Sequence, residues 1–304
     1  MSASHTNWIA VDWGTSNLRC WVFDQNNDVL KQLTSDKGMG ELEPHQFEST
    51  LLSVVEAFLP KDKTTPIIAC GMVGAKQGWQ EATYAKAPCA PHSSASMLKA
   101  KVNDPRIEVH ILPGISSANP PDVMRGEETQ LAGFLSSNPN FNGAICLPGT
   151  HAKWVNVEEN KIAEFTTCMT GELFAVISNE TILRHSLQKG WNQQAFEKGV
   201  SQILSNPESL SAQLFKIRVE YVLQDAAKDA AYSKLSGMLL GSELAATRNY
   251  WQGKKVELIG SETLCAPYAS ALKLAGVEAN ISSGDTMVLE GLKSAYSTLK
   301  SQNN

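Results

Sequence analysis

Short apolar runs separated by turn-forming residues fill the first part of the chain. Three of them precede the first stretch of helical periodicity, at residues 47–59, where apolar residues recur at nearly every third or fourth position. Further apolar runs then alternate with helical stretches. The predicted strands lie at residues 7–12, 18–24, 28–34, 66–70, 107–112, 143–147, 153–157, 255–260 and 277–281. This order predicts an α/β fold, with mixed sheets flanked by helices.

Helical periodicity returns in the second half of the chain, at residues 172–184, 212–223, 235–251, 262–275 and 285–299. Between the halves lies a stretch rich in turn-forming residues, Pro-Gly-Ile-Ser-Ser-Ala-Asn-Pro-Pro, at residues 113–121. A chain of 304 residues with 42% hydrophobic content can form two ordinary cores, so this stretch predicts a domain boundary. We expect an N-terminal domain of residues 1–116 and a C-terminal domain of residues 117–304.

The first two apolar runs enclose a polar turn with candidate phosphate chemistry. The first run ends at Asp12, and the turn of Gly14, Thr15, Ser16 and Asn17 leads into the second run, which indicates a β-hairpin. Backbone N–H groups near a glycine and the two hydroxyls can donate to phosphate oxygens. Asp12 can hold Mg²⁺ through water. A polar turn without a ligand fits this stretch equally well.

A second hairpin of the same kind follows the apolar run at residues 143–147. It turns through Gly149 and Thr150, continues through His151 and Lys153, and returns as a second strand. Two such hairpins, one in each half, suggest a duplicated architecture that holds nucleotide phosphates. His151 and Lys153 are candidate phosphate contacts, although packing and surface roles are open for both.

Two adjacent acids, Glu127 and Glu128, follow Gly126 at the predicted start of a helix. Acids at a helix N-terminus usually compensate its dipole, and that is the simpler interpretation. The functional interpretation is that one of them accepts a proton from a hydroxyl that receives a phosphoryl group. Arg125 lies directly before Gly126 and could bind an anion.

Composition narrows the classes of partner. The net charge of −5 and the isoelectric point of about 5.7 argue against a nucleic-acid or anionic-membrane binder. No apolar run reaches membrane-spanning length, and no secretory signal pattern opens the chain. The six cysteines are scattered, without a C-x-x-C pair, as in a reduced protein. We therefore expect a cytoplasmic protein that binds small molecules, and a homodimer remains open.

Several segments, taken in order, carry a resemblance over essentially the whole chain. They are the hairpin at 11–19, Cys-Gly-Met-Val-Gly at 70–74 with Gly-Trp at 78–79, Met-Arg-Gly-Glu-Glu-Thr-Gln-Leu at 124–131, Pro-Gly-Thr-His at 148–151 with Lys-Trp-Val at 153–155, and Met-Thr-Gly-Glu-Leu at 169–173. Together they resemble the 2-dehydro-3-deoxygalactonokinase family of the actin/hexokinase/Hsp70-like superfamily. The resemblance implies two ribonuclease-H-like, actin-like ATPase domains with a cleft between them. It further implies ATP and Mg²⁺, and transfer of phosphate to the 6-hydroxyl of 2-dehydro-3-deoxy-D-galactonate in galactonate catabolism.

The resemblance also suggests roles for individual residues. Sugar kinases of the superfamily usually place an Asp after a glycine as the base, and here Glu127 takes that position. Glu128 is not excluded by spacing, and Asp12 is assigned to the metal. Gly260 and Ser261, after the apolar run at 255–260, resemble the loop that contacts adenosine.

A substrate with a carboxylate needs a cation or backbone N–H groups. The candidates are Arg125, Lys76 and the turn Gly71, Met72, Val73 and Gly74, which follows a buried strand. Trp79 could line the pocket, although a tryptophan of this kind more often belongs to the core.

Two other classes of function remain. One is a different reaction on the same scaffold, either a phosphohydrolase or a kinase of another sugar acid such as 2-keto-3-deoxygluconate. The other is a nucleotide-dependent sensor or filament protein. The compact length, with no interaction module appended, disfavours the sensor.

Overall fold

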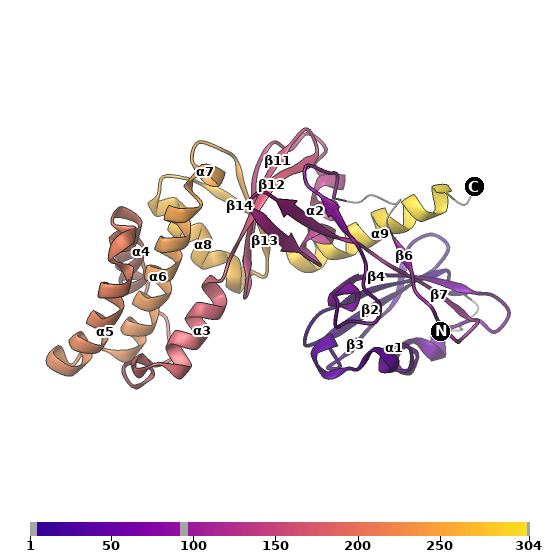
Figure 1. Ribbon diagram of the computed structural model, residues 1–304, viewed down its shortest axis with the longest axis horizontal. Coiled ribbons are helices and arrows are strands. Elements are labelled where there is room, and N and C mark those ends of the chain that lie inside the picture. Colours follow the sequence, from indigo (N-terminus) through magenta and orange to yellow (C-terminus); the bar gives the residue numbers. More distant parts are fainter. Residues whose placement is uncertain (1–4, 92–96, 303–304) are drawn as a thin grey trace. The chain divides into compact units, whose positions relative to one another are not determined.

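A computed structural model describes residues 5–91 and 97–302 of the chain (Figure 1). The chain forms two compact units. Unit 1 comprises Met1–Phe141, Glu159–Ala163 and Gly284–Asn304, and unit 2 comprises Asn142–Glu158 and Glu164–Ser283. Within the described residues, no helix is both long and apolar enough to cross a membrane.

Unit 1 is built on a six-stranded sheet in the order β3-β2-β1-β4-β7-β6. The strands β1 (Trp8–Trp13), β2 (Leu18–Phe23) and β3 (Val29–Ser35) form an antiparallel meander. The strands β4 (Thr65–Gly71) and β7 (Ile107–Ile111) then add in parallel, and β6 (Leu98–Lys99) closes the edge antiparallel to β7. The mixed sheet predicted from the apolar runs is confirmed.

Alternation along β1 divides the core of unit 1 between the two faces of this sheet. Val11 and Trp13 belong to the cluster that includes Phe47 of α1 (Phe47–Val55). Trp8, on the opposite face, stacks against Phe23 and against Tyr296 of α9 (Gly284–Gln302), with ring centroids 4.3 Å apart in both pairs. The last helix of the chain therefore covers the sheet formed by its first residues.

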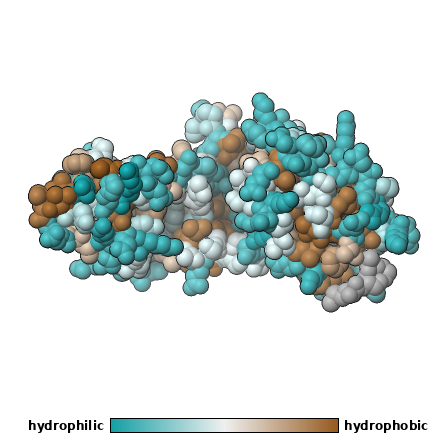
Figure 2. Space-filling model, turned by 90° about the horizontal axis from the view of Figure 1, so that it is seen from below, coloured by the Kyte–Doolittle hydropathy of each residue, from teal (hydrophilic) through white to brown (hydrophobic). Residues whose placement is uncertain are grey.

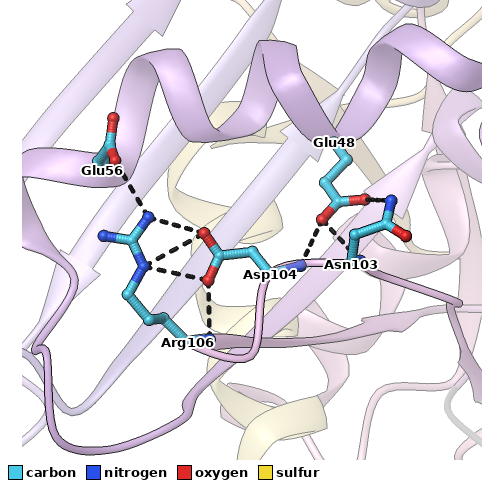
Figure 3. A network of polar contacts seen from close by, with 5 residues as sticks. All are labelled: Glu48, Glu56, Asn103, Asp104 and Arg106. Atoms are coloured by element: carbon cyan, nitrogen blue, oxygen red, sulfur yellow. Dashed lines mark hydrogen bonds and ion pairs between the residues drawn. The ribbon is translucent and has the colours of Figure 1, made fainter.

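A polar network ties α1 to the loop before β7 (Figure 3). Arg106 binds Asp104 at 2.7 Å and Glu56 at 3.0 Å, and the hydrogen bonds from Arg106 lower the pKa of Asp104. Glu48 accepts hydrogen bonds from the backbone and side-chain amides of Asn103, at 2.7 and 2.9 Å. Because these charged groups satisfy one another, we assign the network to the fold and not to ligand binding.

The turn-rich stretch at residues 113–121, which the sequence predicted as a domain boundary, lies inside unit 1. It forms β8 (Gly114–Ala118) and the start of β9 (Pro121–Met124), which pair with each other and, through β8, with β5 (Tyr84–Lys86). The chain then enters α2 (Glu127–Ser137), which packs closely on α9 because Gly133 has no side chain: a Cβ there would lie 1.9 Å from the Met287 carbonyl. Residues 117–141 thus lie in unit 1, so the compact units divide the chain elsewhere than after residue 116.

Unit 2 repeats the strand order of unit 1 in its own sheet, β12-β11-β10-β13-β14. The strands of this sheet are β10 (Gly143–Leu147), β11 (Ala152–Glu158), β12 (Lys161–Cys168), β13 (Val256–Gly260) and β14 (Ala279–Ser283), and the first residues of β12, up to Ala163, are counted with unit 1. As in unit 1, a hairpin, here β10–β11, is followed by two parallel additions, β13 and β14. Three consecutive strands followed by two parallel ones form the ribonuclease-H-like order, and it occurs twice in this chain.

The helices of unit 2 are α3 (Thr170–Glu180), α4 (Gln193–Ser205), α5 (Leu210–Gln224), α6 (Lys228–Ala246), α7 (Arg248–Trp251) and α8 (Glu262–Leu274). Figure 1 shows α4, α5 and α6 side by side at the end of the unit away from its sheet. Apolar surface is visible in Figure 2 at the end where α5 lies, and Phe215 and Leu223 of α5 are 60% and 75% exposed. Neither α4 nor β12 was predicted from the sequence.

Candidate functional site

The first predicted hairpin lies at a hollow of about 870 Å³ in unit 1. The hollow is lined by Asp12, by residues 14–19 of the hairpin and by residues 34–36 at the end of β3. Thr15, Ser16 and Asn17 are exposed, so their polar groups can meet a ligand. The Gly14 N–H donates to the Asn17 carbonyl at 2.9 Å, which closes the turn and leaves ligand binding to the other groups. Four of the predicted phosphate-binding residues, Gly14, Thr15, Ser16 and Asn17, thus line a surface hollow.

Asp12, the last polar residue of β1, is held from two sides. Arg19 donates to its Oδ2 from Nε at 3.1 Å and from Nη2 at 2.5 Å, and a further Arg19 nitrogen bonds Asp285. On the other side, the Cys70 thiol donates to Oδ1 at 3.7 Å. Burial, and then the charge of Asp12, raises the pKa of this thiol, so the sulfur keeps its proton. Arg19 thus binds Oδ2, whereas Oδ1 faces a thiol, which is a weak donor.

Two glycines in unusual conformations bring the start of α2 beside Asp12. Gly71 ends β4 with φ of +90°, and a Cβ there would lie 2.7 Å from the Trp13 carbonyl and 3.4 Å from Asp12 Oδ1. Gly126 precedes α2 with φ of +107°, and a Cβ there would lie 3.4 Å from the Gly71 Cα. The hairpin, the end of β4 and the helix that starts with the two acids thus meet at one place in unit 1.

Glu127 and Glu128 occupy different environments at this place. Glu128 is 1% exposed; its Oε2 accepts from the Gly126 N–H at 2.6 Å, and the Thr129 hydroxyl donates to Oε1 at 3.2 Å. Burial, and then the charge of Glu127, raises the pKa of Glu128 to about 8. Glu127 is partly exposed, and its Oε2 accepts from the Arg125 N–H at 3.1 Å. Of the two acids, Glu127 is the one that a ligand can reach.

Arg125 is held in a defined orientation by the small sheet of unit 1. Its guanidinium lies over the Tyr84 ring, 4.3 Å from the ring centre, and Nη2 donates to the Ala82 carbonyl at 2.8 Å. Nη1 is buried and has no hydrogen-bond partner among the described residues. A cation in a fixed orientation, one residue before Gly126, is suited to an anionic ligand.

The remaining substrate candidates have varied surroundings. Gly71, Met72, Val73 and Gly74 form the end of β4 and a short 3-10 turn (Met72–Gly74), in which Val73 is buried. Lys76 is exposed just after this turn. Trp79 is only 8% exposed and belongs to the core, stacked against Phe47 with ring centroids 6.2 Å apart. It occupies the core position that is usual for such a tryptophan.

The second hairpin joins β10 to β11 in unit 2, as predicted. His151 and Glu172 of α3 contact each other through Nε2 and Oε2 at 2.5 Å, and both side chains are about half-exposed. The Thr150 carbonyl accepts from the Glu172 N–H at 3.0 Å. Lys153 is 5% exposed, and its Nζ donates to the His151 carbonyl at 3.3 Å, so its amine stabilises the turn. The start of α3 therefore holds the Gly149–Thr150 turn in place.

Next to this turn, unit 2 contains a largely apolar cavity of about 730 Å³. Its walls are Pro148 and Gly149 from the hairpin, residues of α3, α6 and α8, and the segment before α4; they include Thr170, Phe174, Lys189, Trp191, Tyr232, Ser236, Leu264, Pro267 and Tyr268. Gly260 and Ser261 lie beside the cavity: a Cβ on Gly260 would lie 3.8 Å from Pro148, and Ser261 accepts from Leu264 at the start of α8. Of these walls, the sequence predicted a ligand role only for Gly149; the segment at 169–173 carried no assigned role, and the walls from α6, α8 and the segment before α4 were not predicted.

Known proteins match this chain over most of its length. The family described as 2-keto-3-deoxy-galactonokinase matches residues 12–295. The chain is 37% identical to a probable 2-dehydro-3-deoxygalactonokinase of Rhizobium meliloti (strain 1021), over 94% of this chain and 95% of that protein. It is 33% identical to the 2-dehydro-3-deoxygalactonokinase of Escherichia coli (strain K12), over 94% and 96%.

Solved structures show the same relationship. A crystal structure from Sinorhizobium meliloti that carries the 2-dehydro-3-deoxygalactonokinase name superposes with a TM-score of 0.88 at 35% identity, covering 96% of this chain and 99% of that one. The activator of 2-hydroxyisocaproyl-CoA dehydratase from Clostridium difficile, solved with ADPNP bound, has a TM-score of 0.51 at 11% identity and covers 97% of both chains. The latter likeness concerns the fold alone.

Proposed function

The chain belongs to the 2-keto-3-deoxy-galactonokinase family, and on this premise we propose that it transfers the γ-phosphoryl group of ATP to the 6-hydroxyl of 2-dehydro-3-deoxy-D-galactonate. The product would be 2-dehydro-3-deoxy-6-phospho-D-galactonate, formed in D-galactonate catabolism. Since the reaction consumes ATP, the proposal places the protein in the cytoplasm. The observation that carries the mechanism is a partly exposed Glu127 at the start of α2, one residue after Gly126, which lies against Gly71 next to Asp12.

We assign the general base to Glu127. A carboxylate at this place can accept the proton of a sugar hydroxyl while the phosphoryl group transfers, and in a loose transition state the demand on its basicity is mild. Glu128 is a poorer candidate because its carboxyl is buried and bonded to Gly126 and Thr129. Its contacts support the backbone from which Glu127 projects.

The first hairpin fits Mg²⁺ and phosphate. Asp12 lines the hollow with one oxygen bound to Arg19 and the other, Oδ1, next to a weakly donating thiol. Mg²⁺ in kinases is typically held by one or two carboxylates, phosphates and water, which suits a single Asp here. The ion would neutralise charge on the phosphates, while Thr15 and Ser16 would donate to their oxygens.

For the nucleotide, the cavity of unit 2 matches a nucleoside in size and chemistry. Its lining is largely apolar, with a few hydroxyls, and it opens next to the Gly149–Thr150 turn. We propose that the base and ribose occupy this cavity and that Gly149, Thr150, His151 and Lys153 lie near the phosphates. Gly260 and Ser261 then support the cavity at the start of α8.

We assign the carboxylate of the sugar acid to Arg125, with Lys76 and the turn at residues 71–74 as further contacts. The position of Arg125, directly before Gly126 and the start of α2, supports this. The fixed guanidinium over Tyr84 also favours a planar, bidentate partner.

A coupled assay of ADP formation with several keto-deoxy sugar acids tests the function. We expect the highest kcat/KM for 2-dehydro-3-deoxy-D-galactonate, and phosphorus NMR of the product should show a phosphate ester at carbon 6. Preference for 2-keto-3-deoxygluconate would reassign the substrate. ATP consumption without a sugar acid would instead indicate a phosphohydrolase or a nucleotide-dependent sensor.

A further inference from the structure

Unit 2 contains a buried carboxylate that no step of the proposed reaction uses. Glu243 of α6 is 4% exposed and lies among apolar residues that include Leu240 and Leu244. No ion pair to it occurs among the residues that the structure describes. Burying an unpaired carboxylate is costly, so its presence requires donors that compensate for lost water.

Three donors from three elements meet this carboxylate. The Trp154 indole N–H of β11 donates to Oε1 at 2.7 Å, and the Tyr268 hydroxyl of α8 donates to Oε2 at 3.0 Å. The Thr170 hydroxyl at the start of α3 provides a third hydrogen bond. Burial raises the pKa of Glu243, and these three hydrogen bonds oppose that rise. The carboxylate thus connects a strand and two helices at one point.

Two of the three donors are walls of the cavity. Thr170 at the start of α3 and Tyr268 of α8 both line it. The residue after Thr170 is also confined: a Cβ on Gly171 would lie 2.5 Å from the Gly149 carbonyl. The position of Thr170 therefore affects both the cavity and the second hairpin.

We propose that Glu243 is a positioning residue for the nucleotide: it holds Thr170 and Tyr268 so that the cavity and the Gly149–Thr150 turn keep one geometry. The proposal rests on the proposed function, because it takes the cavity to be the nucleoside site. Glu243 does not touch the nucleotide. It acts through the two hydroxyls, which without an acceptor would leave their positions or draw in water.

The test compares ADP binding by the full chain and by three variants, using calorimetry, with the melting temperature measured in parallel. Glu243→Met retains the length of the side chain and removes both acceptors, so the dissociation constant for ADP should rise at least about tenfold. Glu243→Gln retains one acceptor, so its dissociation constant for ADP should lie between those of the parent and of Glu243→Met. Trp154→Phe removes the donor that does not line the cavity, so it should lower the melting temperature and change ADP affinity less than about threefold.

Steady-state kinetics supply a second readout. In Glu243→Gln, the KM for ATP should rise while kcat and the KM for the sugar acid change less, which a loss of stability alone would not produce. Parent-like ADP affinity in folded Glu243→Met, or in folded Glu243→Gln if the Met variant does not fold, would overturn the proposal. Failure of the parent itself to bind ADP would instead refute the nucleoside cavity of the proposed function.

Discussion

Arg19 donates two hydrogen bonds to a single oxygen of Asp12, from Nε at 3.1 Å and from Nη2 at 2.5 Å. The two residues face each other across the β1–β2 hairpin, in register as cross-strand partners. The other carboxylate oxygen is directed at the Cys70 thiol, at the end of β4. Asp12 therefore has a fixed orientation before any metal or phosphate arrives.

Asp12→Asn should remove most of the turnover and leave the fold intact. The amide retains the size of the side chain but loses the charge that pairs with Arg19 and would bind Mg²⁺, so the barrier should rise by several kcal/mol. Steady-state kinetics at saturating ATP and Mg²⁺ measure the loss. Asp285→Asn is the matched control: it removes the exposed partner of Arg19, and stability should change by less than about 1 kcal/mol. Parent-like turnover in folded Asp12→Asn would contradict the assignment.

Glu127→Gln should lower turnover about 10²–10⁴-fold, the usual contribution of a positioned base. Nucleotide affinity should barely change, because the carboxylate acts on the acceptor hydroxyl. Glu128→Gln, made in parallel, should retain most of the turnover because Glu128 is buried. If Glu128→Gln is inactive and Glu127→Gln is active, the base is Glu128. If both are active, the base lies elsewhere.

Glu128 should also make stability depend on pH. Its pKa is about 8 in the folded chain, against an ordinary 4.5, because burial and then Glu127 disfavour its charge. A raised folded pKa gives stability that is complete below pH 4.5 and is lost as the pH rises through 8. Urea unfolding should therefore give a free energy that falls by on the order of a few kcal/mol over this range. In Glu128→Gln, the free energy of unfolding should lose this part of its decrease with pH. If it decreases with pH as steeply as in the parent, Glu128 is not the cause.

The sequence predicted the features that depend only on neighbouring residues. The two hairpins and the acids after Gly126 were placed correctly, because each depends on neighbouring residues and on the period of a strand or helix. Residues brought together from distant elements could not be found in this way. The cavity walls of unit 2 come from several separate segments, and Trp79 could line a pocket or a core with the same local sequence. The burial of Glu128 likewise depends on the start of α2 meeting the end of β4, which comes from a distant part of the chain.

Arg125→Lys should raise the KM for the sugar acid about 10–100-fold and leave the KM for ATP unchanged. Lysine retains the charge but cannot form the planar fork that the guanidinium presents. Tyr84→Phe is the matched control, since it retains the ring under Arg125 and removes only a hydroxyl 3.4 Å from Nε. Parent-like KM for the sugar acid in Arg125→Lys would move the carboxylate site elsewhere, with Lys76 as the next residue to test.

Trp191 should report nucleotide binding directly. It lines the cavity of unit 2 and is 51% exposed, whereas the other six tryptophans, Trp8, Trp13, Trp21, Trp79, Trp154 and Trp251, are at most 8% exposed. Acrylamide quenching of the parent is therefore expected to come mainly from this one indole.

A nucleoside in the cavity would cover the indole face, and stacking of a base on an aromatic ring contributes about 1–3 kcal/mol. Saturating ADP should thus reduce acrylamide quenching in the parent and have no such effect in Trp191→Phe. The Trp191→Phe variant should still bind ADP, because phenylalanine retains an apolar ring. Trp251→Phe, which changes a buried tryptophan away from the cavity, is the control and should respond to ADP as the parent does. If ADP binds and Trp191 remains fully accessible to acrylamide, the nucleoside does not occupy this cavity.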